Sequence, residues 1–459
     1  ASGQSTGYTI DQSIRFNDDD SAYMHRTPSS GGNQKTFTYS GWIKLGNLGI
    51  NRWLPFPNVH QNAYYGLYLS NSDILNVFLY YTGSAWQGQL YTNRVFRDTS
   101  AWYHFVLAVD TTQAVPQERV RIYINGVRET SFSTENYPNQ NQDTDFNKAS
   151  EKMWIASRGS SASTYFDGYG AEIHWLDGYA YGPEYFGEFK TDTDIWIPKE
   201  YTGSYGTNGF FIDGRDSGDL GDDESGQGND FTTSGLEAND QVPDSPTNNW
   251  CTWNINDKTP TSVQTISNGS LKVVTAGATT ADGISGTQSI TSGIWYWESR
   301  QQTAEVYNTY IGIKSLEVSN NKLPPTNSPD NGGSTVGYWG LGLYKDGSKV
   351  QDVTTSGNGD IVGIVVNLDA SPQTVQFYRN GSTSGTAIEI SSGFTWLPIS
   401  STNSSGYSPG TTSMTNFGQD STFGGAIAAS ANTGGGGLGS FKYSAPSSSL
   451  ALCSQNLSS

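Results

Sequence analysis

The stretch that decides the fold runs Arg119-Val120-Arg121-Ile122-Tyr123-Ile124-Asn125-Gly126. Apolar residues recur at every second position, with Val120, Ile122 and Ile124 on one face, which is the pattern of a half-buried strand. The strand ends in Asn-Gly, a strong signal for a two-residue hairpin because both residues tolerate positive φ. A second apolar stretch, 374–379, also ends in Asn-Gly, at 380–381. Both halves of the chain therefore predict antiparallel sheet.

The composition points to the same fold class. The 459 residues include 54 Gly, 13 Trp, 27 Tyr and 19 Phe, and only 15% are charged. Glycine supplies turns and aromatic rings fill the cores between sheets, whereas helices use more Glu, Lys, Arg and Leu. The length exceeds what one core normally serves. We predict an all-β protein with two antiparallel, jelly-roll-like β-sandwich domains in series.

The charge and the cysteines restrict the function and the setting. A formal net charge of −18 argues against nucleic-acid binding, which needs a basic surface. Cys251 and Cys453 are far apart and form no Cys-x-x-Cys pattern, so free thiols and folding in a reducing cytoplasm are expected. No apolar run predicts a transmembrane span, and the first residues lack the features of a signal peptide.

The composition and the strand patterning of the sequence change twice along the chain. Strand patterns fill residues 1–200 and 262–459, and the intervening residues 201–261 are rich in Gly, Asp and Pro. Such a composition is typical of irregular connections. We predict one sandwich at 1–200, an acidic connector at 201–261, and a second sandwich at 262–459.

The first region resembles the concanavalin A-like, laminin-G type lectin sandwich over about residues 8–200. The segments that carry this resemblance are 36–42, 102–105, 122–126 and 165–173. The resemblance implies a β-sandwich with a lectin-like role. Domains of the laminin-G type often bind calcium near a sheet edge.

The second region is similar to a SPRY domain. The segments 293–298, 359–363 and 375–381 carry the resemblance, and Asn416-Phe417-Gly418 matches the closing strand of the family. The resemblance implies a bent β-sandwich whose loops bind partner proteins. Those loops vary within the family, so no binding residue is carried over.

The two domains together resemble virion-associated proteins predicted in marine bacteriophages, through the segments 205–211, 225–230 and 244–249. This resemblance implies a tail fibre, a head fibre or a capsid-decorating protein. Such a protein would be made in the bacterial cytoplasm, released by lysis, and would contact other virion proteins. Particle symmetry favours a homo-oligomer, and a trimer is expected for a fibre.

Carbohydrate recognition would use exposed aromatic faces beside amides and carboxylates. A loop-rich stretch of the first region offers such rings, and the candidate carbohydrate-binding residues are Tyr64, Tyr65, Trp86 and Tyr91. The alternative is that these rings belong to a core or to an interface.

Calcium is the one cofactor that the sequence suggests. Hard oxygen ligands gather in the predicted connector, and the candidate metal ligands are Asp216, Asp219, Asp222, Asp223 and Asp230. Their spacing does not match an EF-hand loop. The alternative is that Asp and Gly form solvated turns here.

No catalytic residue is predicted. Sandwich glucanases need carboxylates projecting from one strand face, and the nearest pair, Glu172 and Asp177, is five residues apart and so falls on opposite faces. We therefore predict a non-catalytic virion protein, with a lectin-like domain for adhesion to host-surface glycans and a SPRY-like domain for protein contacts. A free glycan-binding lectin is the alternative, and a polysaccharide hydrolase is the third hypothesis.

Overall fold

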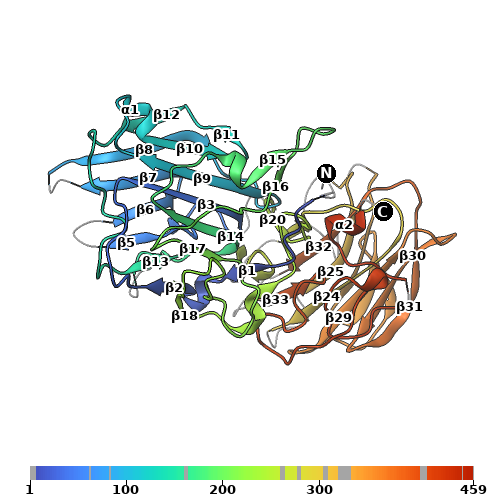
Figure 1. Ribbon diagram of the computed structural model, residues 1–459. Helices are drawn as coiled ribbons and strands as arrows, with labels where there is room; N and C mark the ends of the chain where they lie inside the picture. Colours follow the sequence, from blue (N-terminus) through green and yellow to red (C-terminus); the bar gives the residue numbers. More distant parts are fainter. Residues whose placement is uncertain are drawn as a thin grey trace. The chain divides into compact units, whose positions relative to one another are not determined.

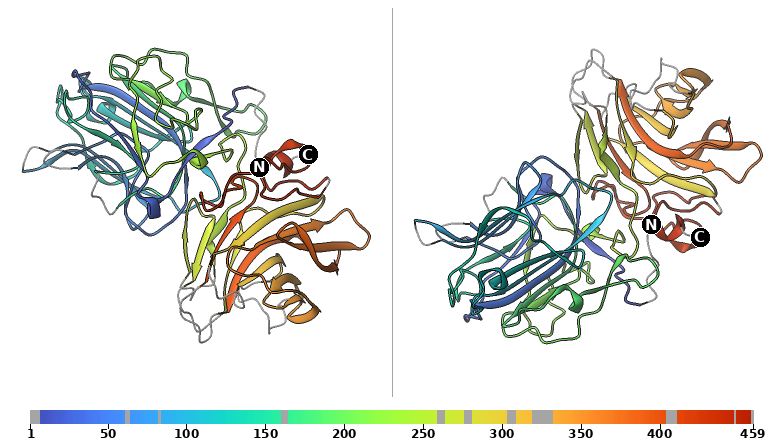
Figure 2. Two further views of the ribbon diagram at one scale, coloured as in Figure 1. Left: turned by 90° about the horizontal axis from the view of Figure 1, so that it is seen from below. Right: turned by 90° about the horizontal axis from the view of Figure 1, so that it is seen from above.

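The computed structural model describes residues 7–60, 64–81, 84–159, 164–258, 264–275, 281–302, 309–318, 332–403, 411–446 and 448–457. The chain divides into two compact units, Ala1–Asn249 and Trp250–Ser459. Each unit is built mainly from strands in antiparallel sheets, which confirms the all-β prediction (Figures 1 and 2). In the described ranges, no helix is long and apolar enough to cross a membrane.

The first sheet of unit 1 joins strands from both ends of that unit. Its order is β11 (Val127–Arg128), β10 (Val120–Ile124), β9 (Trp102–Asp110), β3 (Thr36–Leu45), β14 (Gly168–Asp177), β1 (Ser13–Phe16) and β19 (Gln241–Val242), with β17 (Phe210–Ile212) also paired to β14. The short helix α1 (Pro116–Arg119) leads into β10, and the 3-10 turns Asp18–Asp20, Pro183–Tyr185 and Ala238–Asp240 lie in connections.

The second sheet of unit 1 packs against the first. Its order is β12 (Phe132–Asn136), β8 (Trp86–Val95), β7 (Ile74–Tyr81), β6 (Tyr64–Leu69), β5 (Asn58–His60), β13 (Met153–Ile155), β2 (Tyr23–Arg26) and β18 (Thr232–Ser234), with β4 (Arg52–Trp53) also paired to β6. A separate hairpin is formed by β15 (Gly187–Phe189) and β16 (Trp196–Pro198).

The core of unit 1 lies between the two sheets. The alternation seen in the sequence is realised there, because Val120, Ile122 and Ile124 of β10 all face this core. Trp175 of β14, in the same sheet, and Leu67 of β6, in the opposed sheet, belong to this core and are buried almost completely. One stripe of each strand therefore supplies the core, and the other stripe is left for the outer faces.

Unit 2 is also a two-sheet sandwich. One sheet has the order β20 (Trp253–Lys258), β23 (Ala281–Gly286), β32 (Trp396–Asn403), β25 (Thr309–Ser315), β26 (Thr335–Trp339), β27 (Gly342–Lys345) and β28 (Ser348–Asp352). The other has β21 (Gln264–Ser267), β22 (Lys272–Thr275), β33 (Thr411–Asn416), β24 (Ile294–Gln301), β29 (Ile361–Asn367), β30 (Gln373–Arg379) and β31 (Ser382–Ile390). A 3-10 turn at Gly435–Gly437 and the helix α2 (Ser454–Leu457) follow.

Both predicted Asn-Gly hairpins are confirmed. Asn125 and Gly126 have φ of 48° and 78° and join β10 to β11. Asn380 and Gly381 have φ of 50° and 78° and join β30 to β31. Positive φ at both central residues is the backbone geometry that matches the twist of the flanking strands.

The predicted boundaries differ from the observed ones. Within the predicted connector 201–261, β17, β18 and β19 pair with β14, β2 and β1, so residues up to Asn249 complete the sheets of unit 1. Unit 2 begins at Trp250, before the predicted start at 262. The reason is that short strands separated by Asp-Gly turns have the composition of a loop, although they pair with strands far away in the sequence.

Candidate functional site

The outer face of the second sheet of unit 1 is covered with aromatic and amide side chains. Leu67 and Val77 point into the core, so the alternation of the strands turns Tyr68, Asn76 and Phe78 to the outside. Tyr68 and Phe78 are half-buried rather than fully covered. In Figure 1 this sheet is the blue to cyan layer that carries the labels β5 to β8.

One row of these side chains crosses four strands at right angles to them. Trp53 of β4 pairs with Tyr68 of β6, Tyr68 pairs with Asn76 of β7, and Asn76 pairs with Tyr91 of β8. The rings of Trp53 and Tyr68 are in contact, with centroids 5.2 Å apart. The row therefore places an amide between two groups of rings.

A second row runs parallel to the first. Trp154 of β13 pairs with Asn58 of β5, while Gly66 of β6 pairs with Phe78 of β7 and Phe78 with Gln89 of β8. Asn58 adjoins Gly66 so closely that a Cβ atom on the glycine would lie 1.8 Å from Asn58 Oδ1. Only glycine leaves room for the amide at this point.

The two rows touch each other and form one surface. The Phe78 and Tyr91 rings meet edge to face at 5.7 Å, and Gln89 Nε2 donates a hydrogen bond of 2.6 Å to the Tyr91 hydroxyl. We call this surface the aromatic–amide face, and its members are Trp53, Tyr68, Asn76, Tyr91, Trp154, Asn58, Phe78 and Gln89.

Two amide oxygens of the aromatic–amide face lack a hydrogen-bond partner in the described structure. They are Oδ1 of Asn58 and Oδ1 of Asn76, whose residues are 1% and 6% exposed. Both oxygens are covered by their neighbours, so they belong to the support of the face, and its half-exposed polar groups are those of Gln89 and Tyr91.

The aromatic–amide face itself has no Asp, Glu, Lys or Arg among its eight members. Charges lie at its border, where the Lys152 ammonium sits 5.0 Å from the centre of the Trp154 ring. Burial raises the pKa of Tyr68, and the nearby Arg158 guanidinium opposes that rise. The surface is therefore neutral with a basic margin.

The four predicted carbohydrate-binding residues have different positions. Tyr91 lies on the aromatic–amide face, whereas Tyr65 is 2% exposed and packs in the core. Burial raises the pKa of the Tyr65 hydroxyl, and a hydrogen bond to Asp145 adds to the rise. Tyr64 and Trp86 begin β6 and β8, but their side chains lie outside the described residues.

Sequence reasoning missed most members of the aromatic–amide face. The signal was present in β6 and β7, where the apolar stripe that includes Leu67 and Val77 alternates with Tyr68, Asn76 and Phe78. If alternate residues of each strand are assigned to opposite faces of the sheet, the core side chains are distinguished from those that point outward. Trp53 and Trp154 join the face only through pairing with distant strands, which no local pattern predicts.

The outer face of the first sheet, in contrast, is covered by the chain. Val106 of β9 and Leu176 of β14 form a buried cluster there with Phe186, Tyr201 and Tyr205, which all follow β14 in the sequence. The covering segment buries the centre of this face, while Tyr123, Tyr181 and Phe211, which pack against the cluster, stay half-buried.

His104 is held as a neutral imidazole beneath this cover. The Trp196 indole Nε1–H donates to His104 Nδ1 at 2.9 Å, and His104 Nε2 lies 2.8 Å from Ser40 Oγ. An indole nitrogen is only a donor, so Nδ1 carries no proton and the Nε2–H donates to the serine. Burial lowers the pKa of His104 to about 3, and His174 contributes further.

This histidine should make unit 1 sensitive to mild acid. The unfolded imidazole takes up a proton near pH 6.5, whereas the folded one does so only near pH 3. The unfolded state therefore binds more protons in this range, and stability falls by about 2 kcal/mol between pH 7 and pH 5. Urea unfolding at the two pH values should show this loss in the wild type but not in His104→Gln.

The half-exposed His25 provides the matched control, and His25→Gln should keep the wild-type pH dependence. As a second readout, the His104 proton resonances should not titrate between pH 7 and pH 5. A normal titration near pH 6.5 would show that the neutral imidazole is not required.

The nearest carboxylate pair does not form a hydrolytic site. Glu172 accepts a hydrogen bond from the Tyr8 hydroxyl at 3.0 Å and lies 3.3 Å from His174 Nε2, on the outer side of β14. Asp177 accepts hydrogen bonds from the backbone N–H groups of Asn33 and Asn208. The two carboxylates have separate partners, which agrees with their predicted placement on opposite faces.

The predicted calcium ligands serve as turn caps. Asp223 accepts from the backbone N–H groups of Phe211 and Asn229 at 2.8 Å, and Asp230 accepts from the Asp223 N–H. Asp216 and Asp219 each accept from the N–H group two residues later, at Gly218 and Gly221. Burial and the charges of Asp230 and Asp219 raise the pKa of Asp222. In the described ranges, no group of three or more His, Cys, Asp or Glu side chains is placed to hold a metal ion.

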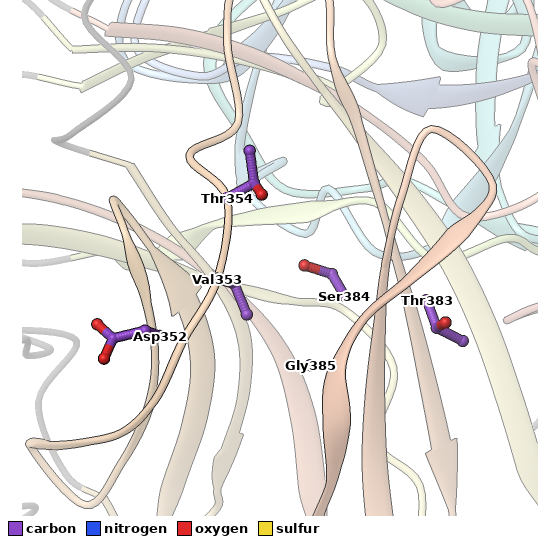
Figure 3. Close-up of a pocket in the computed structure, with 6 residues that line it drawn as sticks. All are labelled: Asp352, Val353, Thr354, Thr383, Ser384 and Gly385. Atoms are coloured by element: carbon purple, nitrogen blue, oxygen red, sulfur yellow. The ribbon is translucent and has the colours of Figure 1, made fainter.

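Unit 2 has a hollow of about 470 Å³ between β28 and β31, the last strands in the orders of its two sheets. Figure 3 shows Val353 and Ser384 turned toward the space between the two segments, while Asp352 points away from it. Asp352 is 2.6 Å from the Lys349 ammonium. Of the other lining residues with hydroxyl groups, Thr354, Thr383 and Ser384, it is Ser384 that points into this space.

Comparison with known proteins identifies the fold type of the first unit. Residues 17–179 match the family model of the concanavalin A-like lectin/glucanases superfamily. That segment contains every member of the aromatic–amide face. A search of curated proteins gives no match.

Similar solved structures include the SPRY domain of human HERC1, at 17% identity and TM-score 0.30, covering 36% of this chain and 96% of that chain. The SAP-like pentraxin from Limulus polyphemus has 15% identity and TM-score 0.29, covering 38% of this chain and 78% of that chain. The TRIM65 PSpry domain has 13% identity and TM-score 0.28, covering 36% and 88%. These scores are too low to assign a function to either unit.

Proposed function

We propose that this chain is a non-catalytic binding protein whose first unit binds neutral glycans on the aromatic–amide face. The observation that carries the proposal is the group of half-exposed rings on one sheet face, together with the half-exposed amide of Gln89. The match of residues 17–179 to a lectin and glucanase superfamily supports a carbohydrate ligand.

The chemistry of a sugar suits both kinds of group. The C–H face of a pyranose ring is apolar and packs against an aromatic ring, while its hydroxyl groups lie around the edge. A hydroxyl near Gln89 would form a hydrogen bond with its half-exposed amide while the sugar contacts Phe78 or Tyr91. Binding would thus bury apolar surface and form a polar contact at the same place.

Removing one central ring should weaken glycan binding without unfolding the chain. Phe78→Ala and Tyr91→Ala should each reduce affinity for a neutral polysaccharide about 5- to 30-fold, equivalent to about 1–2 kcal/mol. Both rings are half-exposed, so the cost in stability is smaller than for a core ring. Calorimetric titration of the full chain measures the affinities.

Tyr185→Ala is the matched control for these variants. Its ring is 42% exposed and stacks on Tyr181, away from the aromatic–amide face. This variant should bind like the wild type. Equal loss in all three variants, or loss in Tyr185→Ala alone, would place the glycan elsewhere.

The second unit is proposed to make protein contacts. The three SPRY-like sequence segments come together in its structure, because β24 pairs with β29 and β29 pairs with β30. The hollow beside Ser384 offers a place for a partner side chain (Figure 3). Filling it with Ser384→Trp should abolish such a contact while glycan binding by unit 1 persists.

The setting proposed for these two activities is a bacteriophage particle, with other virion proteins as partners and a homo-oligomer, expected to be a trimer, as the assembled form. The support is the sequence resemblance of the segments 205–211, 225–230 and 244–249. Antibody labelling of intact particles should reveal the chain on a tail, a fibre or a capsid. Particles that lack it would favour a free lectin instead.

A further inference from the structure

We propose that the side chains of Lys44 and Asn249 become joined by an amide bond inside unit 1, with Asp244 as the group that takes up a proton. The bond would form between Nζ of the lysine and Cγ of the asparagine, and ammonia would be released. This modification does not depend on the ligand that unit 1 binds. It follows from three reactive groups that the fold holds in contact at a buried, aromatic site.

Lys44 is a buried lysine on the outer side of the first sheet of unit 1. Its neighbours Ile43 and Leu45 face the core, so the alternation of β3 turns Lys44 outward. There it lies between Trp102 of β9 and Tyr169 of β14, its paired residues on the adjacent strands, and its side chain has no exposed surface. The ammonium is 5.6 Å from the centre of the Tyr169 ring. The chemistry of this lysine is therefore set by the polar groups that contact it.

A tight turn brings two of these polar groups side by side. Ser245 and Asn248 exchange backbone hydrogen bonds of 3.1 Å and form an isolated antiparallel bridge. Asp244 and Asn249 flank this bridge, so they are the next opposed pair and their side chains project from the same face. Lys44 Nζ lies 2.7 Å from Asp244 Oδ2 and 2.7 Å from Asn249 Oδ1. One amine thus contacts a carboxylate and a carboxamide at once.

The carboxylate and the amide are each oriented by a further hydrogen bond. The Trp102 indole donates to Asp244 Oδ1 at 3.1 Å, and Oδ2 faces the ammonium. Asn249 Nδ2 donates to the Ser100 carbonyl oxygen at 2.7 Å, and its Oδ1 faces the ammonium. The amide carbon is one C=O bond of about 1.23 Å from Oδ1, which places it within about 3.9 Å of Nζ. Reacting atoms approach to about 3–3.5 Å before a bond forms, so a small rotation of the lysine side chain suffices.

These three groups can complete the reaction without another reactant. Asp244 Oδ2 takes one proton from the Lys44 ammonium along their hydrogen bond, which gives an uncharged, nucleophilic amine. The lone pair of Nζ attacks Cγ of Asn249, a second proton passes from Nζ to Nδ2, and the Cγ–Nδ2 bond breaks as ammonia leaves. The third hydrogen stays on the new amide nitrogen, and Asp244 ends as a carboxylic acid. Nothing is oxidised or reduced.

Burial favours the products of this reaction over the reactants. The side chains of Lys44 and Asp244 are both fully buried, and the attraction within a buried ion pair offsets the cost of desolvation only in part. The reaction replaces the two charges with an amide, a carboxylic acid and ammonia, all of which are uncharged. Asn249 is half-buried rather than enclosed, so the ammonia can leave to solvent.

The bond would tie the last residue of unit 1 to the middle of its first sheet. Asn249 ends unit 1, and β3 is the fourth of the seven strands in the order of this sheet. The short strands β17, β18 and β19 lie between Lys44 and Asn249 in the sequence and would be enclosed in a covalent ring. Because a cross-link restricts the unfolded chain, unit 1 should become more resistant to urea once the bond has formed.

Mass spectrometry of the full chain tests the proposal. The intact protein should be lighter than its sequence by the mass of one ammonia molecule. Trypsin cuts after Lys and Arg, but not after a lysine whose side-chain nitrogen is part of an amide. It should therefore release residues 36–52 joined to residues 216–258 as one branched peptide.

Single substitutions identify the three groups. Lys44→Arg keeps a cation but has no nucleophilic amine, and Asn249→Ala has no amide carbon, so both should have the mass of their sequences. Asp244→Asn should form the bond about 100-fold more slowly in a time course of intact mass, because the proton acceptor is missing. Asn248→Ala, which changes the adjacent amide of the same turn, is the matched control and should give the branched peptide in full.

Asn249→Ala also serves as the unbonded reference. It keeps the ion pair of Lys44 with Asp244, so the contribution of that pair to stability is measured in this background without the covalent bond. Should Lys44→Arg fail to fold, Asn249→Ala still shows whether the loss of ammonia requires the amide carbon.

Three results would overturn the proposal. A loss of ammonia that persists in Lys44→Arg would indicate a cyclic imide at Asn249. A loss of the mass of water in place of ammonia would put the bond on Asp244. A wild-type chain with the full mass of its sequence would show that the three groups form hydrogen bonds and an ion pair only. None of these results would bear on glycan binding.

Discussion

Lys44→Met is expected to lower the free energy of unfolding of unit 1 by about 3–5 kcal/mol. Lys44 Nζ lies 2.7 Å from Asp244 Oδ2, and neither side chain is exposed to solvent. It also donates to Asn249 Oδ1 at 2.7 Å. Losing the ammonium would leave a buried carboxylate without its counter-charge, although the Trp102 indole still donates to Asp244 Oδ1 at 3.1 Å. Urea unfolding of the full chain measures the change.

Two comparisons make this prediction specific. Replacing both partners, as in Lys44→Met with Asp244→Leu, should recover most of the loss, because it removes the unpaired buried charge. Lys35→Met removes an ammonium that is 38% exposed and 3.7 Å from Asp143, and it should cost less than about 1 kcal/mol. A Lys44→Met variant as stable as Lys35→Met would refute the argument.

Glu298→Gln is expected to destabilise unit 2 by about 3 kcal/mol. The Glu298 carboxylate accepts the backbone N–H groups of Lys442 and Tyr443, both at 2.8 Å. It also accepts from the Tyr296 hydroxyl at 3.0 Å and from Asn416 Nδ2 at 3.5 Å. Each carboxylate oxygen accepts two of these four hydrogen bonds, so an amide NH₂ in place of either oxygen would face two donors, one of them a backbone N–H. Burial nevertheless raises the pKa of Glu298.

The loss should be visible locally as well as globally. In Glu298→Gln the amide hydrogens of Lys442 and Tyr443 should exchange faster, because this carboxylate fixes the segment to β24. Glu389→Gln, at an exposed position of β31 in the same unit, should leave stability and exchange unchanged. Unaltered exchange at both amides in Glu298→Gln would contradict the assigned role.

The features of the fold that depend on neighbouring residues could be predicted from the sequence. Asn125-Gly126 and Asn380-Gly381 form the expected hairpins because positive φ is a property of the two residues themselves. The segment up to Asn249 could not be placed, because its role depends on distant partners. The sequence predicts that Asp244 lies in a turn, yet its carboxylate forms an ion pair with Lys44, which lies 200 positions earlier.

In the candidate site, too, local features could be predicted from the sequence, whereas features that depend on distant strands could not. Tyr91 could be proposed from the sequence because an aromatic residue beside amides is a local feature, and the structure places it on the aromatic–amide face. Trp53 and Asn58 reach the aromatic–amide face only through pairing with other strands, which local patterns do not specify. The Asp residues of the predicted calcium site could be found by composition, but whether an oxygen ligates a cation or caps a turn depends on the folded backbone.

Glycan binding by unit 1 is tested most directly by a structure of the full chain bound to a neutral glucose tetrasaccharide. We expect sugar density over the aromatic–amide face, with a sugar against Phe78 or Tyr91 and a hydroxyl within hydrogen-bond distance of the Gln89 amide. Density over the stacked tyrosines at Tyr181 and Tyr185, or in the hollow beside Ser384, with the aromatic–amide face empty, would contradict it.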